Sequence, residues 1–167
     1  MTNNLFIVCP FSSVELRLKR KYSNAFFISC PGAIIPYSDN SFIEILKGEI
    51  IRNNIKSVYF VNDTSSRIIN AVLSTKDLFG LDAEYLVEKI YNNAFPQRLK
   101  GCSIQYQQLR LAEFIVQNQK DEFLTNGVFT DLVIDEKIMV KTLVVSPSMN
   151  FFKESRIAFP AILTYEL

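Results

Sequence analysis

Short, continuously apolar runs alternate with amphipathic segments over the first 75 residues of the chain. The runs at residues 5–9, 25–29 and 57–61 each predict a strand that is buried on both faces. Each run is followed by a helix start signal or by apolar residues at helical spacing. Three consecutive units of a strand and a helix are typical of a parallel sheet that is covered by helices.

Two helix starts are indicated by a serine that is followed three positions later by a glutamate. Ser12 with Glu15 and Ser41 with Glu44 match this capping-box spacing. We therefore expect one helix to start near Ser12 and run to about residue 21, and another to start at Ser41. The third helix is indicated by its apolar positions, which are Ile68, Ile69, Val72 and Leu73.

The pattern changes after residue 73. Asp82 can cap a helix, and helical spacing predicts another over residues 106–119. The strands of the last third are predicted at residues 132–134, 138–145 and 157–165. No repeat, low-complexity segment or linker divides the sequence, so we expect residues 1–167 to form a single α/β domain. Its central sheet is expected to be mostly parallel, with helices on both faces and a strand-rich C-terminus.

The chain contains no histidine. This excludes a nucleophile activated by histidine, a histidine metal ligand and a histidine proton shuttle. Lys and Arg total 18 against 17 Asp and Glu, so the net charge is +1. A chain with this balance lacks the excess of positive charge that is typical of nucleic-acid-binding proteins. With 49% hydrophobic residues, the composition is that of a globular protein.

Cysteine usage and the lack of a long apolar run indicate the compartment. Cys9, Cys30 and Cys102 are odd in number and show no CxxC spacing, which favours reduced thiols over disulfides. The apolar stretch near the N-terminus lacks the positive residues of a secretory signal. No run approaches the length of a membrane span. We therefore expect a cytoplasmic protein with neither a membrane nor a nucleic acid as its partner.

Polar residues follow the first and third predicted strands. In the strand order 2-1-3 these strands are neighbours at the topological switch point, where ligands of open α/β sheets bind. Ser12, Ser13, Ser65 and Ser66 lie in loops that open helices, so free backbone N–H groups accompany them. Arg67 adds a positive charge. The pattern fits a site for a small anion or polar ligand, and it also fits serines that only cap helices.

Three segments resemble the β-class carbonic anhydrases. Residues 9–14 stand where that family has its C-x-D-x-R motif, after the first strand and at a helix start. Residues 25–36 resemble the strand followed by R-N-A-G, and residues 60–73 resemble the strand, loop and helix of the G-H-T-D-C-G segment. The resemblance covers roughly the first 75 residues and implies the fold of that family.

The residues at the family's zinc site are not retained. The family binds zinc through two cysteines and a histidine and uses an Asp-Arg pair beside the metal. On this alignment Cys9 stands at the first cysteine, Asp63 at the histidine and Ser66 at the second cysteine. The positions of the Asp-Arg pair are occupied by Phe11 and Ser13, and a shift by one residue would align Asn62 and Ser65 instead. These side chains are a poor set for zinc, which needs three good protein ligands to activate a water.

The resemblance and the lost ligands together predict a non-catalytic protein, a binding or interaction module on a former enzyme scaffold without a zinc cofactor. Two alternatives stay open: an enzyme of different chemistry or small-anion protein that uses the same crevice, and a weak metal site held by Cys9 and Asp63. The candidate crevice residues are Cys9, Phe11, Ser12, Ser13, Asp63, Thr64, Ser65, Ser66 and Arg67.

Several of these residues have a simpler interpretation. Cys9 fits a small buried side chain as well as a reactive thiol or a remaining ligand. Asp63 fits a carboxylate that caps the helix from Thr64 onward. We further expect Phe11 to fill the volume of the former active site. The family resemblance also implies a homodimer, through the helix after Ser41 and the C-terminal strands.

Overall fold

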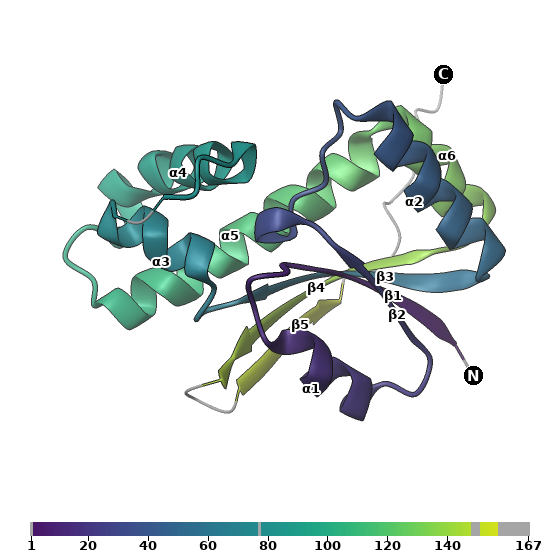
Figure 1. The fold of residues 1–167 in the computed structure, drawn as a ribbon, viewed down its shortest axis with the longest axis horizontal. Coiled ribbons are helices and arrows are strands. Elements are labelled where there is room, and N and C mark those ends of the chain that lie inside the picture. The colour runs from purple at the N-terminus through teal and green to yellow at the C-terminus, as the bar shows by residue number, and fades with distance from the viewer. Residues whose placement is uncertain (1, 77, 148–150, 157–167) are drawn as a thin grey trace, which may run out of the picture.

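A five-stranded sheet with the order β2-β1-β3-β4-β5 organises the chain (Figure 1). The computed structural model describes residues 2–76, 78–147 and 151–156. Its strands are β1 (Asn3–Val8), β2 (Ala25–Ser29), β3 (Ile55–Asp63), β4 (Met139–Ser146) and β5 (Phe151–Arg156). The first four run parallel, and β5 pairs antiparallel with β4. The predicted α/β class, the mostly parallel sheet and the 2-1-3 order of the first strands are confirmed.

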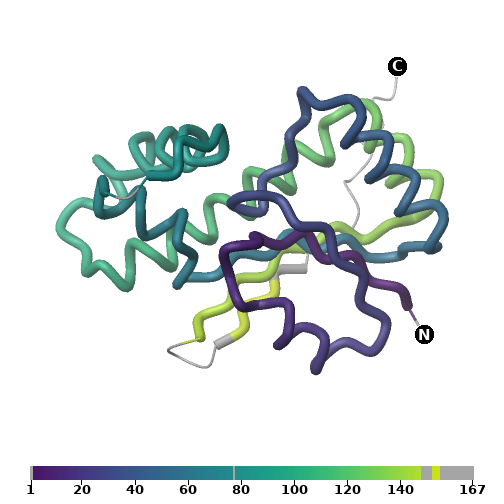
Figure 2. The backbone as a smooth tube through the Cα atoms, in the orientation of Figure 1, coloured from purple at the N-terminus to yellow at the C-terminus, as the bar shows by residue number. Residues whose placement is uncertain are grey.

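Helices cover both faces of the sheet. They are α1 (Val14–Lys21), α2 (Asn40–Arg52), α3 (Arg67–Ser74), α4 (Asp82–Ala94), α5 (Ile104–Thr125) and α6 (Gly127–Asp135), with short turns η1 (Pro31–Ala33) and η2 (Phe95–Leu99). In Figure 1, α1 lies on one face and α2, α5 and α6 on the other. Figure 2 shows that α3, α4 and the first half of α5 stand beyond the carboxyl ends of the strands. No helix of the described residues is long and apolar enough to cross a membrane.

The strands are apolar throughout because the two faces of the sheet are covered by separate apolar clusters. In β1, Leu5 and Ile7 belong to the main cluster under α2, α5 and α6, whereas Phe6 and Val8 belong to the cluster under α1. β3 alternates in the same way, and its nine residues are buried except for one. Successive side chains of a strand point to opposite faces of the sheet, and here both faces are covered. The central strands therefore have no polar face.

The predicted strand at residues 132–134 is wrong, because these residues end helix α6. Asn126 precedes this helix, and its side chain accepts a hydrogen bond from the backbone N–H of Val128 at 3.2 Å. Phe129, Leu132 and Val133 are then buried on one helical face. A run of three apolar residues is too short to distinguish the two periods. The predicted strand at 138–145 is confirmed as β4, and the one at 157–165 lies outside the described residues.

The predicted helix caps are also wrong, although the helices exist. The α2 cap is Asp39, whose carboxylate accepts from the Phe42 N–H at 3.1 Å, so Ser41 lies inside the helix. Ser12, the predicted cap of α1, donates its hydroxyl to the Cys9 carbonyl oxygen, and Ser13, the residue before the helix, makes no side-chain capping bond. At α4 the role expected of Asp82 belongs to Glu84, which accepts from the backbone N–H groups of residues 79 and 81 at 2.7 and 2.9 Å. Several short polar residues at each start offered competing caps.

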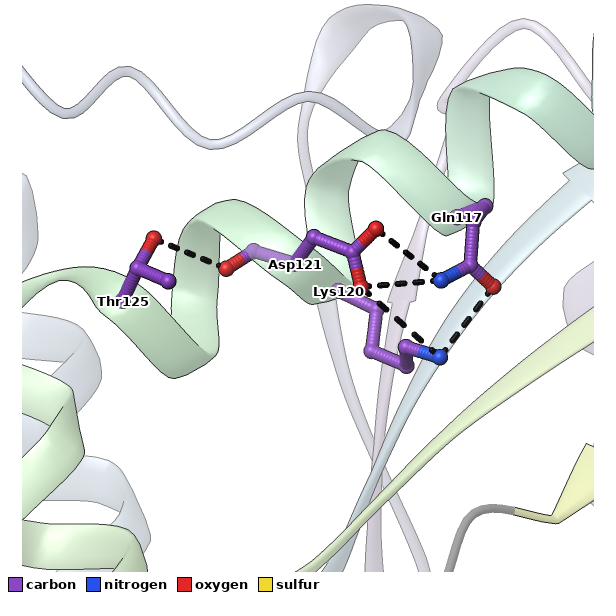
Figure 3. Close-up of polar contacts among 4 residues, drawn as sticks. All are labelled: Gln117, Lys120, Asp121 and Thr125. Atoms are coloured by element: carbon purple, nitrogen blue, oxygen red, sulfur yellow. Dashed lines mark hydrogen bonds and ion pairs between the residues drawn. The ribbon is translucent and has the colours of Figure 1, made fainter. Parts of the chain in front are cut away.

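A lysine is buried on the sheet-covering helix α5 (Figure 3). Lys120 is 1% exposed, and its Nζ donates to Gln117 Oε1 at 3.1 Å and lies 3.9 Å from Asp121 Oδ1. Gln117 in turn donates to both carboxylate oxygens of Asp121. Burial lowers the pKa of Lys120, and the charge of Asp121 opposes this effect only in part.

We expect Lys120→Met to raise the free energy of unfolding by about 1 kcal/mol at pH 7, because a methionine of similar length removes a buried charge. The folded-state pKa of Lys120 is below that of the unfolded chain, so the unfolded state binds the proton more tightly. The cost of burial is therefore complete below the folded-state pKa and disappears as the pH rises through about 10. Urea unfolding between pH 7 and 10 should show the advantage of the variant shrinking. Lys89→Met, at an exposed position of α4, is the control; an advantage that grows with pH would contradict the prediction.

Candidate functional site

The loops after β1 and β3 meet at the carboxyl edge of the sheet, as parallel neighbours require. A third segment, η1, joins them. The Gly32 N–H donates to Cys9 Sγ at 3.2 Å, and Asn62 Nδ2 donates to the carbonyl oxygen of Gly32 at 3.2 Å. The three loops therefore contact one another through buried hydrogen bonds.

Gly32 is required at the centre of this contact. Its φ is +67°, and a Cβ there would lie 3.2 Å from Ile34 Cδ1. Ala33, the next residue, is also left-handed, with a φ of +59°. This tight turn aims the Gly32 N–H at the Cys9 sulfur. The dipeptide Pro31-Gly32 is a common turn signal, but the contact of Gly32 with Cys9 depends on the fold.

Both cysteines near this turn are buried. Cys9 is 1% exposed and Cys30 is 2% exposed. Burial raises the pKa of the Cys30 thiol to about 12, and the neighbouring Cys9 contributes to the shift. Cys30 therefore remains a neutral thiol, in agreement with its interpretation as a small buried side chain.

Asp63 is buried at the end of β3 and is used by the turn that follows. Its Oδ1 accepts from both the N–H and the Oγ of Ser65 at 2.7 Å. The helix α3 begins only at Arg67, so Asp63 caps the turn and not the helix. The expectation of a helix from Thr64 onward is wrong, because the Ser66 N–H donates to the Asp63 carbonyl and completes the turn first.

Two buried polar atoms in this loop have no hydrogen-bond partner among the described residues: Asp63 Oδ2 and Ser66 Oγ. Asp63 is 1% exposed and Ser66 is fully buried. The adjacent Thr64 is by contrast satisfied, because its N–H donates to the Val145 carbonyl and its Oγ1 to Ser146 Oγ, both at 3.0 Å. Ser146 was not singled out in the sequence, since only the pairing of β3 with β4 brings it here.

Phe11 packs against Phe79, a residue that the sequence analysis missed. Their rings are stacked with centroids 5.2 Å apart and an interplanar angle of 9°. Phe11 is half-buried and also packs against the main apolar cluster. The guanidinium carbon of Arg67 lies 5.1 Å from the Phe79 ring centroid. Phe79 comes from the loop before α4, and nothing in its local sequence indicates that it reaches the loop after β1.

The remaining serines have local roles. Ser12 Oγ donates to the Cys9 carbonyl oxygen at 3.0 Å. Ser13 and Ser65 are exposed, and Arg67 is exposed on the outer side of α3. Of the predicted set, Cys9, Asp63, Thr64 and Ser66 are buried.

These side chains do not form a zinc site of the usual kind. Among the described residues, no group of three or more His, Cys, Asp or Glu side chains is placed to hold a metal ion. The donors at the crevice are one thiol, one carboxylate and one hydroxyl, and hydrogen bonds from Gly32 and Ser65 already engage the first two. A serine hydroxyl is a weak zinc ligand, so the set does not fit the metal.

Comparison with known proteins reveals similarity only at the level of structure, because no family model and no curated protein matches the sequence. The β-carbonic anhydrase CafA of Aspergillus fumigatus superposes with a TM-score of 0.80 at 19% identity, over 95% of this chain and 77% of that one. The fold is that of the β-carbonic anhydrases. Wild-type CafD of the same fungus gives a TM-score of 0.77 at 13% identity, over 93% and 90% of the two chains. A tetrameric β-carbonic anhydrase of Sordaria macrospora gives 0.74 at 12%, over 92% and 80%.

Proposed function

We propose that this chain is a non-catalytic protein on the β-carbonic anhydrase fold, which serves as a binding or interaction module. The observation that carries the proposal is the chemistry at the three positions where the family resemblance implies zinc ligands. Cys9, Asp63 and Ser66 offer one good ligand, one moderate ligand and one poor ligand. Zinc-activated water needs three good protein ligands and an open fourth position.

The hydrogen bonds of the crevice support this proposal. The Cys9 sulfur accepts from Gly32, and Asp63 Oδ1 accepts twice from Ser65. A metal would have to compete with these contacts. The positions that would carry the catalytic Asp-Arg pair hold Phe11, which cannot accept a proton, and Ser13, which lacks the charge and the paired donors of an arginine.

We also propose that the crevice is closed. Phe11 stacks on Phe79 instead of presenting a polar group. The buried Asp63 carboxylate disfavours an anion in the interior, since a second negative charge would be held beside it at low dielectric. Among the described residues, no ion pair joins Arg67 to Asp63, and the Arg67 guanidinium lies over the Phe79 ring instead. A small anion inside the crevice is therefore the less favoured alternative.

The metal content of the purified protein tests the proposal. We expect much less than one zinc per chain after expression in zinc-supplemented medium, and no hydration of carbon dioxide above the buffer rate. Elemental analysis and stopped-flow hydration measure the two properties, with CafA of A. fumigatus prepared in parallel as the positive control. About one zinc per chain that only strong chelators remove, or hydration above background, would overturn the proposal.

Association into a homodimer is part of the same proposal. It is implied by the family resemblance, and the structural neighbours include tetrameric enzymes. β2 lies at one edge of the sheet and β5 at the other, so each pairs with a single strand among the described residues. Light scattering on the preparation used for metal analysis reports the mass, and about 19 kDa over a wide concentration range would contradict a dimer.

The unpartnered buried atoms favour one alternative function. Asp63 Oδ2 could accept a hydrogen bond from a small polar ligand, and Ser66 Oγ could donate one to it. In the metal version of this alternative, Asp63 and Cys9 hold a divalent ion weakly. Elemental analysis that includes manganese, iron, cobalt and nickel separates this alternative from the closed crevice. A stoichiometric metal other than zinc that is lost in Asp63→Asn would support it.

A further inference from the structure

A cavity lies beside helix α3. Its volume is about 350 Å³. The described residues that line it are Arg67, Asn70, Ala71, Leu73, Ser74, Lys76, Phe79 and Ile104. The cavity is thus built from α3, the loop before α4 and the first residue of α5, and its size suits a small ligand.

Arg67 is held in place at this cavity. Its guanidinium lies over the Phe79 ring, 5.1 Å from the centroid. Phe79 is itself fixed by its stack on Phe11 and by the hydrogen bond that its N–H donates to Glu84 Oε1 at 2.7 Å. Among the described residues, Arg67 has no carboxylate partner. A guanidinium that lies over an aromatic ring is held there by a cation–π contact, and its N–H groups can still donate to an anion.

The described residues that line the cavity carry a net positive charge. Arg67 and Lys76 are cationic, and none of the described lining residues is acidic. The polar atoms of Asn70 are occupied, because its Nδ2 donates to the Ser65 carbonyl at 3.3 Å and its Oδ1 accepts from Gln108 at 2.7 Å.

We propose that this cavity binds a small phosphate monoester. Two cations on one cavity match the double negative charge of a phosphate monoester better than the single charge of a carboxylate, and the guanidinium fork can hold two phosphate oxygens at once. Leu73 and Ile104, with the edge of Phe79, form an apolar wall for the organic group of the ester. Arg67 also belongs to the predicted crevice set, but the buried members of that set, Cys9, Asp63, Thr64 and Ser66, do not line this cavity.

Phenyl phosphate is the probe, titrated into the full-length protein by calorimetry at low ionic strength. We expect saturable binding of one equivalent, tighter than that of inorganic phosphate because the phenyl group meets the apolar wall. Arg67→Gln should weaken binding roughly tenfold or more, since it removes a charge-assisted pair of hydrogen bonds. Lys76→Gln should weaken it by a smaller factor.

Arg20→Gln is the matched control, because Arg20 is exposed on α1 and changes the net charge equally. It should leave binding unchanged, and circular dichroism confirms that each variant is folded. Absence of saturable binding would overturn the proposal, and so would equal weakening by Arg67→Gln and Arg20→Gln. Metal content is measured independently, so failure of this site leaves the proposed non-catalytic function standing.

Discussion

The double variant Asp63→His, Ser66→Cys is expected to retain about one zinc ion per chain, whereas the wild-type chain and each single variant retain far less. With Cys9, the two substitutions supply the two cysteines and one histidine that the family resemblance implies. Metal ligands act as a set, because a tetrahedral ion gains most of its binding free energy only when three protein ligands are in place. Elemental analysis after gel filtration gives the stoichiometry.

Zinc binding should also raise the melting temperature of this double variant, since the ion binds the folded state. Carbon dioxide hydration should nevertheless stay at the buffer rate, because the positions of the Asp-Arg pair still carry Phe11 and Ser13. The matched control is Asp63→His with Ser65→Cys, which places the new thiol on an exposed neighbour. Equal zinc in the two double variants would show that the assignment of Ser66 to the second cysteine position is wrong.

The fold could be predicted to a large extent because its central strands are buried on both faces. Phe60 and its neighbours in β3 leave no polar face, and a run of this kind has few interpretations other than a central strand. The residues 132–134 were misassigned because their helical period only becomes evident together with Phe129, which lies outside the apolar run. The predicted helix caps were wrong for a different reason. Asp39 and Ser41 are both residue types that cap helices, and the backbone conformation before α2 decides which of them does so.

The site could be predicted in part. Topology places the loops after β1 and β3 at the same edge of the sheet, so their adjacency could be predicted from the strand order alone. The sequence could not indicate which atoms are already used. The bond from Gly32 to Cys9 depends on a left-handed turn in a third loop, and the stack of Phe79 on Phe11 depends on the packing of α4. Both contacts join residues far apart in the chain.

A three-ring cluster fixes the layer of helices over the sheet. Phe123 of α5 lies between Phe60 of β3 and Phe129 of α6. Its ring centroid is 5.5 Å from that of Phe60, with an interplanar angle of 68°. The centroid of Phe129 is 4.3 Å away, with an interplanar angle of 21°. All three side chains are fully buried. Phe123 therefore joins the central strand β3 to both α5 and α6. Its removal would leave a cavity that neighbouring side chains on three elements cannot all move to fill.

We expect Phe123→Ala to lower the free energy of unfolding by about 3 to 5 kcal/mol, the range for a fully buried phenylalanine. For a chain of this size the loss corresponds to a fall in melting temperature of roughly 10 °C. Urea unfolding followed by circular dichroism measures the difference. Phe114→Ala, a half-buried position on the same helix whose ring lies under Arg98 and Arg110, should cost clearly less. Equal losses at the two positions would contradict the role of the ring cluster, because the gain in helix propensity from Phe to Ala is the same at both. A second test is Phe123→Leu, which fills part of the volume and should recover a substantial share of the lost stability.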